Sequence, residues 1–306
     1  MRRFLAILLP LLLVMLAAAC RPAADTPVVY LSDRRPLAGP VSEAVRPLRV
    51  AVAAVISPQG TVASYQLLLS YLADRLSRPV ELVQRRTYAE VNALIETGAV
   101  DLAFVCTSAY VVGHDDFNME LLVAPRVNGR TVYYSLLIVP QASSAASMAD
   151  LQGKVFAFTD PMSNSGRLYP TYLVQQLGSA PGQFFSRTFY TYSHDDAIHA
   201  VADGLADGAA VDSLVYDFAV AREPDLAERT RIIHRSPPFG IPPVVINPDL
   251  RPQLKAELQS LLLNMAGDPQ GSAALQAIGV ERFVLLNDPA YNSARDLLAA
   301  VRLEEP

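Results

Sequence analysis

The stretch "GAVDLAFV" at residues 98–105 recurs in a similar form as "GLADGAAV" at residues 204–211. Each copy has a glycine suited to ending a helix, an aspartate three positions later, and an apolar run typical of a buried strand. The copies begin 106 residues apart (204 − 98), which is too far for a solenoid repeat. Since the order of elements around both copies also matches, we interpret them as equivalent parts of two α/β lobes. The alternative is a chance match of a short motif.

Expected strands and helices alternate around each copy. In the first half, strands are expected at 48–56, 79–85 and 100–105, with helices at 61–77 and 88–98. In the second half, strands are expected at 154–159, 189–192 and 207–211, with helices at 167–178 and 195–204. This alternation predicts right-handed crossovers and a mainly parallel open sheet, flanked by helices, in each lobe.

Two extended segments, 132–140 and 231–248, are placed to connect the lobes as hinge strands. The tail at 250–303 is expected to be helical and to pack on the first lobe. The sequence therefore predicts lobe 1 at 47–138 plus 240–306 and lobe 2 at 139–239. Two lobes joined by two extended connections are suited to closing around a ligand.

The N-terminus has the pattern of a secretory signal peptide at 1–19, with two arginines, an apolar run and three alanines. The alternative is an uncleaved anchor helix, although the apolar run is short for a membrane span. Cys20 follows directly, and "LAAAC" resembles the bacterial lipoprotein signal, which predicts lipidation of Cys20. Residues 20–46 are rich in proline and charge, and we interpret them as a tether. The expected location is the periplasm, at the membrane surface.

Composition excludes some classes of function. The 306 residues carry a formal net charge of −5, so the chain lacks the basic footprint of a nucleic-acid-binding protein. No G-x-x-x-x-G-K-[ST] run is present, which excludes a nucleotide-hydrolysing P-loop. Two cysteines occur, so lipidation of Cys20 would leave Cys106 as a lone thiol, either buried or functional.

Ligands of open parallel sheets bind beyond the carboxyl ends of the strands. The small polar loop after strand 154–159 leads into a helix, so hydroxyl and backbone N–H groups there are suited to binding an anion. Simple capping of the helix by Ser163 or Ser165 is the alternative. The same rule adds residues after the other strands, and the predicted ligand-binding residues are Cys106, Thr107, Ser108, Tyr110, Ser163, Asn164, Ser165, Gly166, His194 and Asp212.

Three of these residues have more specific expected roles. His194 could donate to an oxyanion, or it could cap the helix at 195–204. Asp212 must meet a protonated ligand oxygen or a cationic neighbour such as Arg167. Cys106 is either an inert buried thiol or a soft ligand for arsenic or a thiophilic metal. A Cys106–His194 nucleophile–base pair would make the chain an enzyme, but the sequence contains no local nucleophile signature.

The chain from about 48 to 286 resembles periplasmic phosphate/phosphite/phosphonate-type substrate-binding proteins of ABC transporters. The stretches that carry this resemblance are "GAVDLAFVCTSAYV" (98–111), "LQGKVFAFTDPMSNSGRLYP" (151–170), "YSHDDAIHAVADGLADGAAVDS" (192–213) and "SPPFGIPPVVI" (236–246). The resemblance implies a two-lobed type II periplasmic binding protein whose D-P-x-S-x-S-G loop holds phosphonate oxygens. It carries over to Ser163, Asn164, Ser165, His194 and Asp212, and more weakly to Tyr110.

Asn164 stands where the family usually has threonine. Cys106 resembles a branch of the same family that binds arsenite through one cysteine and reports to a membrane sensor kinase. The sequence therefore predicts a non-enzymatic protein without cofactor or metal. It captures a small oxyanion for an ABC permease, and the alternative is an arsenite sensor that signals to a histidine kinase.

Overall fold

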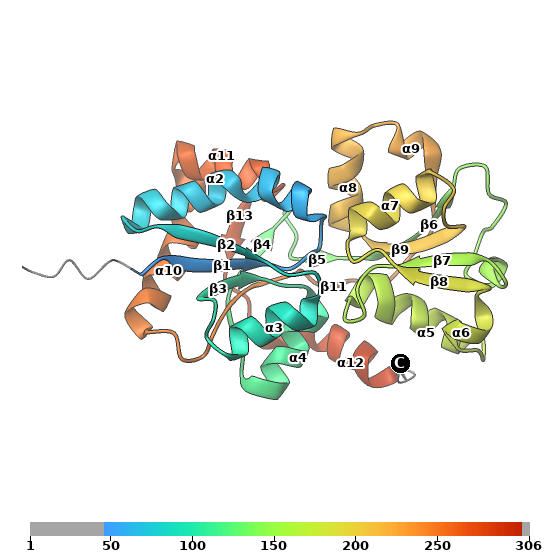
Figure 1. The fold of residues 1–306 in the computed structure, drawn as a ribbon, viewed down its shortest axis with the longest axis horizontal. Coiled ribbons are helices and arrows are strands. Elements are labelled where there is room, and N and C mark those ends of the chain that lie inside the picture. The colour runs from blue at the N-terminus through green and yellow to red at the C-terminus, as the bar shows by residue number, and fades with distance from the viewer. Residues whose placement is uncertain (1–45, 302–306) are drawn as a thin grey trace, which may run out of the picture. The chain divides into compact units, whose positions relative to one another are not determined.

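The computed structural model describes residues 46–301, which form two helix-flanked sheets and a small two-stranded pair between them (Figure 1). The first sheet has the order β13-β4-β12-β3-β1-β2 and the second the order β10-β6-β9-β7-β8. We call the parts around the first and second sheets lobe 1 and lobe 2. The predicted signal peptide, the predicted lipidation site Cys20 and most of the predicted tether lie outside the described residues.

The strands of lobe 1 are β1 (Leu48–Val52), β2 (Val80–Gln84), β3 (Leu102–Phe104), β4 (Glu120–Arg126), β12 (Val244–Ile246) and β13 (Arg282–Val284). Those of lobe 2 are β6 (Ser135–Pro140), β7 (Val155–Phe158), β8 (Arg187–Tyr190), β9 (Gly208–Asp212) and β10 (Thr230–Arg235). The small pair consists of β5 (Val132–Tyr133) and β11 (Phe239–Gly240). Each strand that the sequence predicted around the two repeated motifs is present.

Helices cover both faces of each sheet, as Figure 1 shows. Lobe 1 has α2 (Pro58–Leu76), α10 (Pro252–Asn264) and α11 (Pro269–Ala277) on one face, and α3 (Tyr88–Glu96), α4 (Thr107–Phe117) and α12 (Asn292–Ala300) on the other. Lobe 2 has α7 (His194–Ala202), α8 (Ser213–Arg222) and α9 (Leu226–Arg229) opposite α5 (Tyr169–Gln176) and α6 (Pro181–Phe184). Strand β1 accordingly buries Val50 in one core and Ala51 in the other.

The repeated motif has the same structural role in both lobes. Gly98 and Gly204 follow α3 and α7 with φ of +65° and +72°, a region that glycine enters without the steric penalty of a Cβ. The carboxylate of Asp101 accepts a hydrogen bond from Arg49 N (2.9 Å), and that of Asp207 accepts one from Val155 N (2.8 Å). Each aspartate therefore joins its strand to the neighbouring parallel strand, which is β1 in lobe 1 and β7 in lobe 2.

Both sheets are mixed: most strands of each sheet run in one direction, as the sequence predicted, and the others run against them. β1 pairs in parallel with β2 and β3, and β7 does so with β8 and β9. The strands next to these parallel cores, β12 in lobe 1 and β6 in lobe 2, are antiparallel. Each of these antiparallel strands directly follows a hinge strand, β5 before β6 and β11 before β12, so its direction follows from the hinge connections.

The hinge segments differ in detail from the prediction. Segment 132–140 is two strands, because the chain leaves the β5–β11 pair at Tyr134 before β6 begins. All of β6 pairs within the second sheet, whereas the predicted lobe boundary at 138/139 passes through it. The tail beyond 250 is helical apart from β13, which adds an antiparallel strand to β4.

Candidate functional site

The predicted site residues are all buried where the two lobes meet. Hydrogen bonds join the lobes at this place: Tyr88 N to Asp160 Oδ2 (3.0 Å), His194 N to Val55 O (2.9 Å), Ser57 N to Asp195 Oδ1 (2.8 Å), and Ser108 Oγ to Met162 O. The carboxyl ends of the strands therefore face each other across a closed interface, as the sheet rule predicted.

Ser163 begins the helical segment that carries the small polar loop. This segment opens with a π-helical turn at Asn164–Leu168 and continues as α5. Ser163 Oγ accepts a hydrogen bond from Gly166 N at 3.0 Å, so Ser163 is a helix cap, as the capping alternative required. Ser165 Oγ has no such role, because no hydrogen-bond partner reaches it in the described part of the chain.

A hydrogen-bonded chain connects Ser163, His194 and Asp212. The backbone N–H of Asp212 donates to His194 Nδ1 (3.0 Å), so the proton of the neutral ring is on Nε2. Nε2 lies 3.3 Å from Ser163 Oγ and donates to it. Since Ser163 Oγ also accepts from Gly166 N, the hydroxyl proton of Ser163 is left to donate to a ligand oxygen.

His194 is neutral in this arrangement. Burial lowers the pKa of His194 to about 3, so the ring carries no positive charge near neutral pH. It does not cap α7 either, because the preceding Ser193 does so by accepting from Asp196 N. The ring instead orients the Ser163 hydroxyl.

Asp212 caps α8 by accepting a hydrogen bond from Leu214 N (2.7 Å). Burial raises the pKa of Asp212 to about 7, so a large fraction of this carboxyl group is protonated near neutral pH. Arg167 does not compensate Asp212: its Nε donates to Tyr190 Oη and its guanidinium lies over the Phe158 ring. A protonated Asp212 can itself donate to a ligand oxygen, whereas the sequence analysis expected the carboxylate to meet a protonated ligand oxygen.

Several buried polar atoms near this chain lack a hydrogen-bond partner within residues 46–301. They are Ser165 Oγ, Thr159 Oγ1, Tyr88 Oη and Asn164 Oδ1. Buried polar atoms are normally hydrogen-bonded, so a cluster of unpaired ones is typical of a site that a ligand completes. The three hydroxyl groups can all act as donors.

Asn164 fits this interpretation in either orientation of its amide. Its Nδ2 donates to Tyr133 Oη at 3.1 Å, which leaves Oδ1 unpaired. Rotation of the amide by half a turn lets Tyr133 donate to Oδ1 and turns the N–H groups of Asn164 towards a ligand. An anion favours the second orientation, because it requires donors.

Gly166 allows a close approach inside the polar loop. A Cβ at this position would lie 1.9 Å from Thr159 Oγ1, far inside van der Waals contact. Thr159 N also donates to Gly166 O at 3.3 Å. The absence of a side chain at Gly166 therefore lets the loop pack against Thr159 and holds the Thr159 hydroxyl at the site.

Three residues of this cluster were missed by the sequence analysis, namely Tyr88, Tyr133 and Thr159. Tyr88 and Thr159 come at or just after the carboxyl ends of predicted strands, so the rule that found the other residues could have found them. Tyr133 lies in the short hinge strand β5, and no local pattern in the sequence points to it. The electrostatic influence of Cys106 and Asp212 on both tyrosines places the phenols beside these groups, and burial raises the pKa of both phenols well above the ordinary value.

The Cys106 thiol lies in the same region, as the N-terminal flanking residue of α4. Burial raises the pKa of Cys106, and hydrogen bonds from the backbone N–H groups of Asn164 and Ser108 only partly oppose this rise. The thiol is thus protonated, and the ring of His194 contacts Ser163 and not Cys106. This geometry does not form the nucleophile–base pair that the enzyme hypothesis required.

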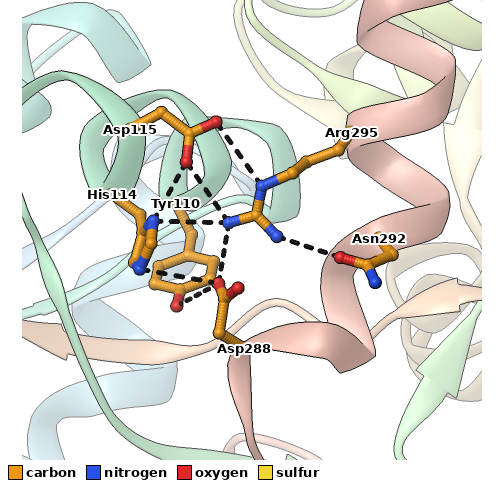
Figure 2. Close-up of polar contacts among 6 residues, drawn as sticks. All are labelled: Tyr110, His114, Asp115, Asp288, Asn292 and Arg295. Atoms are coloured by element: carbon orange, nitrogen blue, oxygen red, sulfur yellow. Dashed lines mark hydrogen bonds and ion pairs between the residues drawn. The ribbon is translucent and has the colours of Figure 1, made fainter.

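The remaining predicted residues have structural partners. Thr107 Oγ1 donates to Gly240 O in the hinge at 2.7 Å, and Ser108 Oγ donates to Met162 O across the interface. Tyr110 Oη donates to Asp288 Oδ1 at 2.9 Å within a polar cluster that also contains Arg295 (Figure 2). Its hydroxyl is therefore engaged with the C-terminal segment, and we leave Tyr110 out of the proposed ligand site.

The site can hold an anion through neutral donors alone. The available groups are hydroxyls, amide N–H groups and a protonated carboxyl, and none of the residues described above contributes a positive charge. Among the described residues, no group of three or more His, Cys, Asp or Glu side chains is arranged to hold a metal ion. Hydrogen bonds to a charged oxygen are stronger than neutral ones, so such a site is suited to an oxyanion.

Residues 50–291 match the family model described as ABC transporter, phosphonate, periplasmic substrate-binding protein. The chain belongs to this family. This is the family that the sequence resembled, and it is a family of transport-linked binding proteins and not of enzymes.

Individual relatives agree with this assignment. The phosphate-import protein PhnD of Mycolicibacterium smegmatis is 34% identical over 164 residues, which are 50% of this chain and 51% of that protein. The chain thus spans about half the length of this curated relative in the match.

Solved structures support the two-lobed type II fold. A binding protein component of an ABC phosphonate transporter from Pseudomonas aeruginosa is similar with a TM-score of 0.78 and 22% identity, covering 83% of this chain and 86% of that one. PhnD1 from Prochlorococcus marinus in complex with methylphosphonate is similar with a TM-score of 0.73 and 19% identity, covering 82% and 96%. Within residues 46–301, no helix has both the length and the apolar character needed to span a bilayer.

Proposed function

We propose that the protein captures a small phosphonate or phosphate-class oxyanion between its lobes and delivers it to an ABC permease. The observation that carries this proposal is the cluster of buried, unpaired hydroxyl groups beside the Ser163–His194–Asp212 chain. The proposed ligand-binding residues are Cys106, Ser163, Asn164, Ser165, Gly166, His194 and Asp212, together with Tyr88, Tyr133 and Thr159. Thr107 and Ser108 position this site from α4 and the lobe interface.

Relatives with known ligands agree with this class. The Mycolicibacterium smegmatis protein is a phosphate importer, and PhnD1 from Prochlorococcus marinus was solved with methylphosphonate. Both ligands present several oxygens on a tetrahedral phosphorus. A set of hydroxyl and amide donors converging on one point matches such a group.

Ser165→Ala is the sharpest test of this function. Ser165 Oγ is buried without a partner in the described chain, so its removal costs the folded protein no hydrogen bond. We expect phosphate or methylphosphonate affinity to fall by about 10- to 100-fold, the value of a lost hydrogen bond to a charged group. The melting temperature without ligand should stay unchanged or rise. Calorimetric titration and thermal unfolding of the same preparations measure both quantities.

Ser163→Ala is the matched comparison. Ser163 is both a helix cap and the partner of His194, so this variant should lose stability as well as affinity. Wild-type affinity in Ser165→Ala would contradict the proposed site. Absence of phosphate or phosphonate binding in the wild-type protein would contradict the proposed function.

The arsenite-sensor alternative rests on the Cys106 thiol, which lies in the same cluster as the hydroxyl donors. This alternative requires arsenite to bind the wild-type protein and not the Cys106→Ser variant. Phosphonate binding should be the same in both proteins. Titration of both proteins with arsenite and with methylphosphonate separates the alternatives. A response to phosphonate alone favours transport.

Export and anchoring complete the proposal. The signal peptide pattern and the position of Cys20 support a mature lipoprotein held at the outer face of the membrane by a tether ending near residue 46. Mass spectrometry of the mature N-terminus tests this point. A chain that begins at Cys20 with an attached diacylglycerol is the expected result, and an unmodified N-terminus would contradict it.

A further inference from the structure

A second cavity, of about 290 Å³, lies beside the proposed oxyanion site. Its walls come from both lobes and from the hinge. Lobe 1 contributes side chains such as Phe104 and Phe283, lobe 2 contributes Leu214 and Val215, and the return segment contributes Ile241 and two prolines. Most of the residues around this cavity are apolar, which distinguishes it from the hydroxyl-rich oxyanion site.

The two sites are contiguous through Asp212. This residue lines the cavity, and its backbone N–H belongs to the chain that orients Ser163. Val55 makes a second connection, because its side chain lines the cavity while its carbonyl accepts from His194 N. Val105, a third lining residue, directly precedes Cys106. The oxyanion site and the cavity therefore share Asp212 and lie next to each other.

The charged groups around the cavity do not favour a cationic substituent. Its charged lining residues within the described chain are Asp212 and Asp217. A large fraction of Asp212 is protonated near neutral pH, since burial raises its pKa to about 7. Desolvation raises the pKa of Asp217, and the nearby Arg235 partly opposes this rise. Since Asp217 is also exposed to water, its charge is screened and partly compensated. What is left for a ligand is mainly apolar surface.

The size of the cavity also suits an organic group. An apolar cavity of about 150 Å³ holds a benzene molecule, so about twice that volume accommodates a short alkyl chain or one aromatic ring. Inorganic phosphate and methylphosphonate are too small to fill this cavity, so water would remain in contact with its apolar walls. A ligand that filled it would gain the hydrophobic contribution of each buried carbon.

We propose that the ligand is a phosphonate bearing an apolar alkyl or aryl substituent, with its phosphoryl oxygens at the oxyanion site and its substituent in this cavity. This inference rests on the proposed function. It names the class of phosphonate that the site prefers.

The test is calorimetric titration of the full chain with inorganic phosphate, methylphosphonate, butylphosphonate, phenylphosphonate and 2-aminoethylphosphonate. Each buried methylene should raise the affinity by about fourfold. Butylphosphonate and phenylphosphonate should therefore bind at least about 10-fold tighter than methylphosphonate. The heat capacity change should become more negative as the substituent grows, because more apolar surface is buried.

Variants of the cavity wall give a second measurement. Leu214→Gln places an amide on the wall, and we expect the affinity ratio of butylphosphonate to methylphosphonate to fall by about 10-fold or more. Val215→Thr, which is closer in shape, should lower the same ratio by a smaller factor and covers the case in which the first variant does not fold. Leu177→Gln, at an exposed position of lobe 2 outside the cavity, should leave the ratio unchanged.

The outcomes separate this inference from the function on which it rests. If none of the five compounds binds, the proposed function itself fails. If phosphate or methylphosphonate binds and the larger alkyl and aryl phosphonates bind no tighter, the function stands and this inference is overturned. Tighter binding of 2-aminoethylphosphonate than of butylphosphonate would also overturn it, since the two carboxyl groups would then select a cation.

Discussion

His194 and Asp212 are two buried titratable groups held neutral beside each other. Burial lowers the pKa of His194 to about 3 and raises the pKa of Asp212 to about 7. Below about pH 6.5 the unfolded chain binds a proton at His194 that the folded protein excludes, so acid destabilises the fold through this group. Between about pH 4 and pH 7 the folded protein keeps a proton on Asp212 that the unfolded chain releases. Rising pH thus destabilises the fold through Asp212.

These opposite dependences give a pH prediction. In the wild-type protein the two effects offset each other between about pH 4 and pH 6.5. Asp212→Asn should leave only the histidine effect, so its stability should rise with pH across this range more steeply than that of the wild type. His194→Gln should show the reverse slope. Urea unfolding of the three proteins across this range measures how the free energy of unfolding depends on pH. The same dependence in all three proteins would refute the opposite pKa shifts assigned to His194 and Asp212.

Gly166 is the residue at which a single methyl group should have the largest local effect. Gly166→Ala forces a Cβ against Thr159, whose side chain is fully buried and cannot move far. We expect a loss of about 1 to 3 kcal/mol in the free energy of unfolding, typical of overpacking, and weaker oxyanion binding. Gly267→Ala is the control, because no atom lies within 4 Å of a Cβ there. Equal stabilities of the two variants would show that the loop adapts.

At the scale of elements, α12 holds the C-terminus of the described chain against both lobes. Figure 2 shows Arg295 of α12 between Asp115 of α4 and Asp288, with the Tyr110 hydroxyl also bound to Asp288. Further along the helix, Leu297 packs in the cluster that contains Tyr133 of the hinge. The helix therefore fastens lobe 1 to the hinge strand that carries a proposed ligand-binding phenol.

Arg295→Met should weaken the attachment of α12 to lobe 1. The variant keeps an apolar stem but loses ion pairs to Asp288 (2.7 Å) and Asp115 (3.4 Å), and it leaves Asp288 with fewer partners. We expect a loss of about 1 kcal/mol and faster hydrogen exchange in α12. Arg229→Met is the control, since Arg229 pairs with Asp203 and Asp225 at a more exposed position. Equal losses in both variants would show that the α12 cluster contributes no more than a surface pair.

At the scale of the whole folded unit, the backbone and carboxylate hydrogen bonds between the lobes decide whether the site is enclosed. Asp160 is central because Oδ2 accepts from Tyr88 N of lobe 1 while Oδ1 accepts from Met162 N of its own loop. Asp195 makes a single contact of this kind between the lobes, in which Oδ1 accepts a hydrogen bond from Ser57 N. Closure through these contacts is what would remove a bound oxyanion from water.

Asp160→Asn and Asp195→Asn test this closure as a pair. An asparagine has one acceptor oxygen, so it can replace Asp195 but can satisfy only one of the two donors at Asp160. We expect Asp160→Asn to lower oxyanion affinity by about 10-fold, mainly through faster ligand release, and Asp195→Asn to change it little. Stopped-flow binding measures the release rates. Similar effects of the two substitutions would contradict a role of the second oxygen in closure.

The amino-acid sequence by itself determined the alternation of strands and helices, the equivalence of the two glycine–aspartate motifs, and the polar groups that follow the strands. These features depend on neighbours along the chain: a period of apolar residues, a glycine with positive φ, or a serine that caps a helix. For this reason the loop from Ser163 to Gly166, together with His194 and Asp212, could be predicted as candidate site residues without a structure.

Only the tertiary structure decided which way the longer side chains point and what encloses the site. Tyr110 turns to Asp288 because the C-terminal segment packs against α4, and Tyr133 reaches Asn164 because the hinge passes behind the polar loop. The antiparallel strands and the apolar cavity likewise arise from segments that are distant along the chain, such as Phe104 and Val244, which pair between β3 and β12. The physical reason is that burial and the partners of a side chain are set by distant parts of the chain, which no local pattern encodes.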